Sequence, residues 1–202
     1  MNFEELQSNV SEALSWRKIE LQQARYLAEN AAEIDLPYLC RAWTLIMYAH
    51  CDQYTKEVCR LYLEYLRDNP RDSYDYWSIW LAFRAKQLML DASDGASFES
   101  VLNPRESDKS ELIDCILHKS VIDSGNFSYK RFRFIMKFVL QVDFDCVAYN
   151  GFCLTLKTKR DEIAHGESSF VAEVSDCITW HVPTLALLDG VHDTVLNTAS
   201  RA

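Results

Sequence analysis

Glycine, proline and long apolar runs are scarce in this chain. Its 202 residues include only five Gly and four Pro, too few for the many turns of a β-sandwich or barrel. No run reaches the roughly 18 apolar residues that a membrane span requires, and segment 1–13 carries acids where a signal peptide has an apolar centre. We therefore expect an all-α, soluble, cytoplasmic protein built as an up-and-down helical bundle with extra helices.

Cysteine is present but unpatterned. The seven cysteines are odd in number, scattered, and without any C-x-x-C spacing, which argues against a disulfide framework and against a zinc knuckle. His50, Cys51 and Asp52 are adjacent, but neighbouring helical residues point about 100° apart and do not converge on one ion. The sequence therefore predicts no metal site and no cofactor.

Apolar residues recur at helical spacing along most of the chain. With 49% hydrophobic residues, the chain is long enough for one core, so we expect a single domain over 1–202 with an irregular internal loop at about 91–109. The expected helices cover 3–32, 36–69, 74–90, 110–123, 129–141 and 146–164. A last helical region should follow Ser168 or Ser169, and Pro183 should kink or split it.

One segment of this acidic chain is basic. The formal net charge is -9, yet segment 128–160 carries a local balance of +5, which leaves -14 on the remainder. Such asymmetry permits a surface for an anionic ligand on an otherwise acidic body. The alternative is two solvated helix faces without a ligand.

Arg160 occupies an unusual position in the expected helix 146–164. At 100° per residue it falls on the apolar stripe with Phe152, Leu156 and Ile163. A guanidinium does not lose its charge, so it must reach a carboxylate, a carbonyl, a bound anion or a wet cleft. The alternative is a structural arginine that snorkels or forms a salt bridge.

His165 lies five residues further on. On an ideal helix it would point about 140° away from Arg160, but Gly166 is a favoured signal for a helix end and would let the imidazole swing back. Alternatively, the pair meets its symmetry mate across a two-fold axis. A lone histidine at a helix end is also a common surface residue.

Residues 160–167, RDEIAHGE, resemble the R-x4-H motif of the HEPN superfamily, especially the bacterial MAE-type HEPN proteins. Residues 45–50, LIMYAH, resemble that group's Tyr-Ala-His segment on an early long helix, and residues 126–128 lead into a basic-apolar helix that precedes the motif helix. The resemblance implies a HEPN-like bundle, a homodimer whose two motifs face one cleft, and a metal-independent endoribonuclease.

The resemblance also implies roles for individual residues. His165 would act as general acid or base, Arg160 would hold the scissile phosphate, and Asp161 would orient one of them. Attack by the ribose 2′-OH would leave a cyclic phosphate, so DNA should be inert. RNA would be steered by the basic residues of the two helices, which are Lys157, Lys159, Lys130, Arg131, Arg133 and Lys137. The protein would be a toxin or effector in bacterial defence or a toxin-antitoxin system, with an antitoxin or defence protein as partner.

The chain departs from the family pattern at two places. Cys51-Asp52-Gln53 stands where the related proteins often have Trp-Glu-Gly, and Glu167 stands where nucleotidylated HEPN toxins carry tyrosine. Two other functions therefore remain open. One is a catalytically silent HEPN module that binds RNA, a nucleotide or a partner protein, and the other is a purely structural helical dimer in which Arg160 is paired internally.

Overall fold

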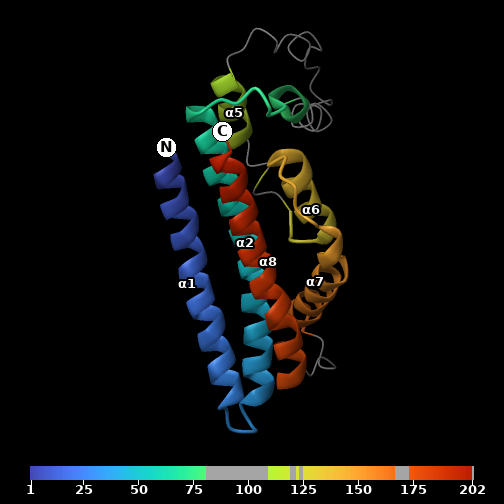
Figure 1. The fold of residues 1–202 in the computed structure, drawn as a ribbon. Helices are drawn as coiled ribbons and strands as arrows, with labels where there is room; N and C mark the ends of the chain where they lie inside the picture. The colour runs from blue at the N-terminus through green and yellow to red at the C-terminus, as the bar shows by residue number, and fades with distance from the viewer. Residues whose placement is uncertain (81–108, 119–121, 123–124, 167–172, 202) are drawn as a thin grey trace, which may run out of the picture.

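The chain forms an all-α bundle, as predicted (Figure 1). This computed structural model describes residues 1–80, 109–118, 122, 125–166 and 173–201, and no strand occurs within those ranges. No helix among these residues is long and apolar enough to cross a membrane. The α-helices are α1 (Phe3–Glu29), α2 (Leu36–Asp68), α5 (Lys109–His118), α6 (Tyr129–Phe134), α7 (Asn150–Ala164) and α8 (Val174–Ser200).

Three long helices, α1, α2 and α8, form the centre of the bundle (Figure 1). Thr44 meets Cys177 at 3.8 Å near one end of α2, and the Tyr65 hydroxyl donates to the Ala199 carbonyl at 3.5 Å near the other. These two contacts make α2 and α8 parallel. Fully buried apolar side chains fill the space between the helices, among them Leu6, Leu21, Trp43, Tyr54, Leu63 and Val191.

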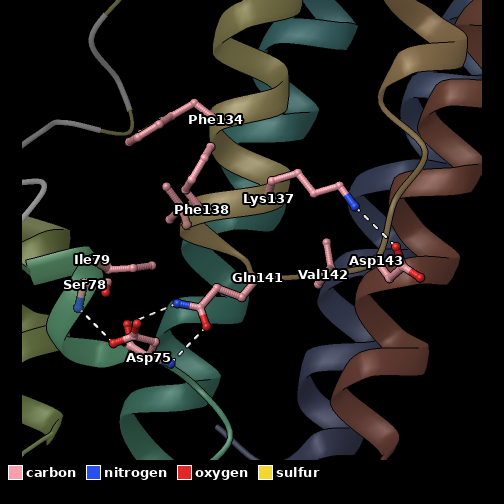
Figure 2. Close-up of a pocket in the computed structure, with 10 residues that line it drawn as sticks. Asp75, Ser78, Ile79, Phe134, Lys137, Phe138, Gln141, Val142 and Asp143 are labelled. Carbon is pink, nitrogen blue, oxygen red and sulfur yellow. Dashed lines mark hydrogen bonds and ion pairs between the residues drawn. The ribbon is translucent and has the colours of Figure 1, made fainter.

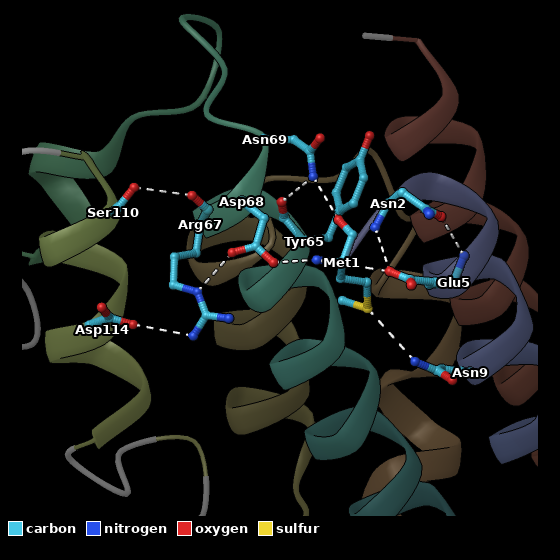
Figure 3. A network of polar contacts seen from close by, with 10 residues as sticks. All are labelled: Met1, Asn2, Glu5, Asn9, Tyr65, Arg67, Asp68, Asn69, Ser110 and Asp114. Carbon is cyan, nitrogen blue, oxygen red and sulfur yellow. Dashed lines mark hydrogen bonds and ion pairs between the residues drawn. The ribbon is translucent and has the colours of Figure 1, made fainter.

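The ends of α1 and α2 lie close to their predicted positions. Asn2 and Glu5 form a reciprocal capping box at the start of α1, which satisfies two backbone donors. Pro37 lies in the first turn of α2, as expected, although Asp35 occupies the N-cap position without a side-chain hydrogen bond. At its far end, α2 is tied to the N-terminus and to α5, because Asn69 donates to the Met1 carbonyl at 2.8 Å and Ser110 donates to the Arg67 carbonyl at 3.1 Å (Figure 3).

The last helix is not split at Pro183, where the sequence predicts a kink or a split. α8 continues through it from Val174 to Ser200, and its N-cap is Glu173, whereas Ser168 and Ser169 lie outside the described residues. An internal proline costs about 3 kcal/mol. Buried side chains on both sides of it, such as Cys177 and Leu187, hold the helix together through packing.

The predicted helix over 129–141 begins correctly and then changes character. Ser128 caps it by accepting from the Arg131 N–H at 3.3 Å, but the regular helix ends at Phe134 and a π-helix, η2, covers Ile135–Val139. Gln141 then adopts a left-handed φ of 53°. A 3-10 turn, η3 (Val147–Tyr149), leads into α7.

The region between α2 and α6 is described only in part. Residues 76–80 of the expected helix 74–90 are helical, and 81–90 lie outside the described residues. The expected loop at 91–109 also lies outside them, except for Lys109, which begins α5. α5 is described as far as His118, residues 119–121 lie outside the described residues, and Ile122 is already in a turn, one residue before the expected helix end at 123. Gly125 turns the chain with a φ of 92°.

Candidate active site

The C-terminal end of α7 is built as the sequence predicts. The helix ends at Ala164, and the His165 backbone N–H donates to the Asp161 carbonyl at 2.9 Å. Gly166 has a φ of 72° and donates to the Ile163 carbonyl at 3.1 Å. A side chain would be strained in that conformation, so Gly166 allows the chain to leave the helix directly after His165. The His165 side chain is exposed.

The Arg160 guanidinium lies on the ring of Tyr48, which belongs to α2. Cζ is 5.3 Å from the ring centroid, and Nη1 donates to Asp161 Oδ1 at 3.0 Å. An aromatic face and a carboxylate thus accept the charge that the sequence places on an apolar stripe. The Arg160 side chain still keeps 32% of its surface exposed, which leaves room for a further anion.

Tyr48 is a rigid platform for that arginine. Its hydroxyl donates to the Phe127 carbonyl at 3.1 Å, and its ring meets the Phe127 ring edge to face. Burial, followed by the nearby Asp52, raises the pKa of Tyr48 to about 12, although Arg160 acts in the opposite direction. The phenol is therefore neutral at pH 7 and supports Arg160 without acting as a base. Sequence reasoning missed this contact, since it noted Tyr48 only within a resembling segment.

Asp161 is shared between two cations of its own helix. It accepts from Lys157 one turn earlier and from Arg160 beside it. The Lys157 hydrogen bond, assisted by Arg160, holds the pKa of Asp161 below its usual range. Among the described residues, Asp161 contacts the arginine, and no hydrogen bond joins this carboxylate to the His165 side chain.

A second ion pair extends the polar face of α2 beyond Tyr48. Lys56 is buried, donates to Asp52 at 2.7 Å, and also donates to the Gly125 carbonyl at 3.1 Å. Tyr48, Asp52 and Lys56 follow each other at four-residue intervals and therefore share one side of the helix. This four-residue spacing is visible in the sequence, and it could have predicted which side of α2 faces α7.

The neighbours of Asp52 point elsewhere. His50 lies between α1 and α2, with its ring 5.2 Å from that of Trp16 and Nε2 2.7 Å from Glu20 Oε2. Burial lowers the pKa of His50, against the opposing effect of Glu20. Within the described part of the chain, no three His, Cys, Asp or Glu side chains are grouped to hold a metal ion.

The outward face of α7 carries His165. Val147 and Leu154 are 72% and 64% exposed, and Gly151 between them faces open space. His165 follows Leu154 by eleven residues, which is about three helical turns, so it lies on the same face. Arg160 points toward α2 instead, and no hydrogen bond links the two side chains in this part of the structure.

The basic residues expected to contact RNA differ in their exposure and in their partners. Lys130 and Arg133 are exposed on α6. Lys137 pairs with the exposed Asp143 at 3.3 Å, a weak kind of pair that a phosphate can replace. Lys159 pairs with Glu162 at 2.9 Å, and both of these side chains are partly buried. Arg131 turns inward and donates to the Ile122 carbonyl at 2.9 Å, so it braces the turn before α6.

A comparison with protein families gives a match over almost the whole chain. A family model described as MAE_28990-like HEPN matches residues 6–202. No curated protein and no solved structure matches the chain.

Proposed function

Because the chain belongs to the MAE_28990-like HEPN family, we propose that it is a metal-independent endoribonuclease that acts as a homodimer. The observation that carries this proposal is the state of Arg160. Its guanidinium is held in place by the Tyr48 ring and Asp161, yet a third of the side chain stays exposed, and a histidine follows five residues later at the end of the same helix. Fixed cations of this kind stabilise charge that develops on a phosphate.

The proposed reaction follows from the two side chains. The ribose 2′-OH attacks the adjacent phosphorus, a P–O2′ bond forms, and the P–O5′ bond breaks. His165 takes the proton from the 2′-OH or gives one to the departing O5′, since imidazole performs both tasks near neutral pH. Arg160 holds the non-bridging oxygens as negative charge grows on them. The products are a 2′,3′-cyclic phosphate and a 5′-OH.

A two-fold dimer through α7 would complete the cleft. The exposed Val147 and Leu154 and the bare backbone at Gly151 provide an apolar face along which two copies of α7 can pack closely. The His165 side chains of both copies would then meet in one cleft, with an Arg160 five residues before each of them along α7. Leu154→Glu should convert the dimer to monomer in sedimentation and reduce cleavage, whereas Ile34→Glu, at an 87% exposed position before α2, should change neither.

The reaction itself is tested with chelator-treated protein and a labelled RNA. We expect cleavage products that end in a 2′,3′-cyclic phosphate, and no cleavage of the same strand when it is made of DNA. Products with a 3′-OH, or equal cleavage of DNA, would contradict attack by the 2′-OH.

The biological setting we propose is that of a toxin or effector in bacterial defence or a toxin-antitoxin system, restrained by an antitoxin or defence protein. Induced expression of the wild-type protein should stop growth, and His165→Ala should relieve it.

A catalytically silent HEPN module is the second candidate function. It is favoured by the net charge of -9 and by Cys51-Asp52-Gln53 in place of Trp-Glu-Gly. Salt-sensitive RNA binding without any product would support it.

A further inference from the structure

A cavity of about 650 Å³ lies on the face where η2 meets the helical residues 76–80. Ile79 from that helical segment points toward Phe138 of η2, and Phe134 lies one turn earlier on α6 (Figure 2). Val142 adds an apolar wall, while Asp75 and Lys137 supply polar groups at the margin. None of these side chains belongs to the Arg160 and His165 site, so the cavity is a separate feature.

Three side chains form a column along this face. The Arg131 guanidinium lies 5.6 Å from the Phe134 ring centroid. The Phe134 and Phe138 rings are stacked, with centroids 6.0 Å apart and planes at 28°. The column ends at Phe138, which is 57% exposed. A single exposed aromatic ring is ordinary on a protein surface, but this ring ends a stack and also lines a cavity.

The backbone beside the cavity is irregular in two ways. Phe138 and Lys137 lie on the π-helix, a form found mostly as short bulges and often at functional sites. Gln141 has a left-handed φ of 53°, which is unfavourable for a residue with a side chain. Its amide is locked by two hydrogen bonds to the Asp75 backbone, at 2.9 and 3.1 Å (Figure 2). These bonds fix the distance between the two walls of the cavity.

Basic residues lie along α6 and η2 beside the aromatic face, while Asp75 and Asp143 also line the cavity. Lys130 and Arg133 are exposed on α6, and Lys137 forms an ion pair with the fully exposed Asp143. Segment 128–160 is the basic part of an acidic protein. A ligand that combines a flat ring with phosphate groups would match both the rings and the cations.

We propose that this cavity binds a nucleobase of single-stranded RNA, which stacks on Phe138 while Lys130, Arg133 and Lys137 contact the flanking phosphates. The inference rests on the proposed function, which makes RNA the substrate, and gives the enzyme a second point of contact away from the scissile bond. A base in RNA and a free mononucleotide share this chemistry, so the test must separate them.

The test uses a short 2′-O-methyl oligoribonucleotide that contains 2-aminopurine. Its blocked 2′-oxygen prevents cleavage, and stacking on an aromatic ring quenches its fluorescence. Phe138→Leu should weaken binding about tenfold and abolish the quenching, because stacking on one aromatic ring is worth roughly that much. Phe138→Trp should preserve both. Tyr38→Leu is the matched control, since Tyr38 is a 74% exposed aromatic residue at the opposite end of α2 and should change neither.

The outcomes separate this inference from the proposed function. Loss of binding in Phe138→Leu would support the inference even if the protein never cleaves RNA. Unchanged binding and quenching in Phe138→Leu would overturn it, even if RNA cleavage is established. Binding of AMP that depends on Phe138, without such dependence for the oligonucleotide, would overturn the assignment to RNA.

Discussion

Arg17 and Arg160 make the same two kinds of contact and yet differ in what they can do. Arg17 stacks on Trp16 at 4.2 Å and pairs with Glu57 at 2.6 Å. Arg160 stacks on Tyr48 at 5.3 Å and pairs with Asp161 at 3.0 Å. The side chain of Arg17 is only 4% exposed, whereas that of Arg160 is 32% exposed. The difference in exposure, and not the partners, separates an internal brace from a candidate phosphate ligand.

The two arginines also differ in which helix supplies the carboxylate partner. Arg17 donates to the Ala13 carbonyl on α1 at 2.6 Å and bonds to Glu57 on α2, so it holds the two helices together. The carboxylate partner of Arg160 lies on the same helix and is shared with Lys157. An ion pair of that kind contributes about 0.3–0.5 kcal/mol, and a phosphate can readily compete with it.

The largest effect is expected at His165, the histidine at the end of α7. His165→Ala should lower the rate of RNA cleavage by about 10²–10⁴-fold, because a positioned general acid or base contributes that much. The exposed His165 makes no hydrogen bond through its side chain to the described residues, so the urea unfolding midpoint should not change. His192→Ala, which removes a hydrogen bond to Ser11, is the control and should leave cleavage intact. Undiminished cleavage in His165→Ala would remove this residue from the mechanism.

Arg17→Ala should lower the stability of the fold. We expect the free energy of unfolding to fall by about 3 kcal/mol, because the change removes a buried cation and the packing of its stem. Arg25→Ala is the matched control on the same helix, since Arg25 forms only an exposed pair with Glu29, and its cost should stay below about 0.5 kcal/mol. A small loss in Arg17→Ala would mean that the two arginines do not differ in the way described above.

Tyr48 tests whether the ring positions Arg160. Tyr48→Leu should lower cleavage about tenfold, the effect of roughly 1.4 kcal/mol. Tyr48→Phe keeps the ring and loses only the hydrogen bond to Phe127, so it should retain most of the activity. The loss should appear in kcat more than in KM, because the ring acts through the arginine. Equal losses in both variants would assign Tyr48 a purely structural role.

The smallest effect is expected at Asp161. The pKa of Asp161 is lowered in the folded protein, from about 3.9 for an aspartate in an unfolded chain. The ionised Asp161 therefore stabilises the fold at neutral pH, and this stabilisation is lost as the pH falls through the folded-state pKa. Asp161→Asn should therefore reduce cleavage a few-fold at every pH and leave the acid side of the pH-rate profile unchanged. A shift of that side in Asp161→Asn would identify Asp161 as the titrating group.

The sequence alone does not distinguish Arg17 from Arg160. Periodicity places Arg160 on an apolar stripe, but Arg17 lies between Leu14 and Leu21 on the stripe of its own helix in the same way. Only tertiary contacts tell the two apart, because burial depends on which helix covers each stripe. The Tyr48 platform was missed for the same reason, since it depends on how α7 packs on α2.

The helix ends were predicted more reliably than the tertiary contacts. Gly166 at the end of α7 and Ser128 at the start of α6 were both predicted and both confirmed, because helix ends are set by neighbouring residues. The π-helix after Phe134 was not predicted, and of the kink or split expected at Pro183 the split does not occur. In both cases packing against other elements outweighs local preference.

Arg160→Ala tests the central claim most directly. Cleavage of a labelled RNA in chelator should be measured on the same sample as the urea unfolding curve. The account predicts that cleavage falls by about 10²–10³-fold, as for the loss of one fixed donor to a developing oxyanion, while the unfolding midpoint stays at the wild-type value. Cleavage at the wild-type rate, or a loss of cleavage that only follows unfolding, would contradict it.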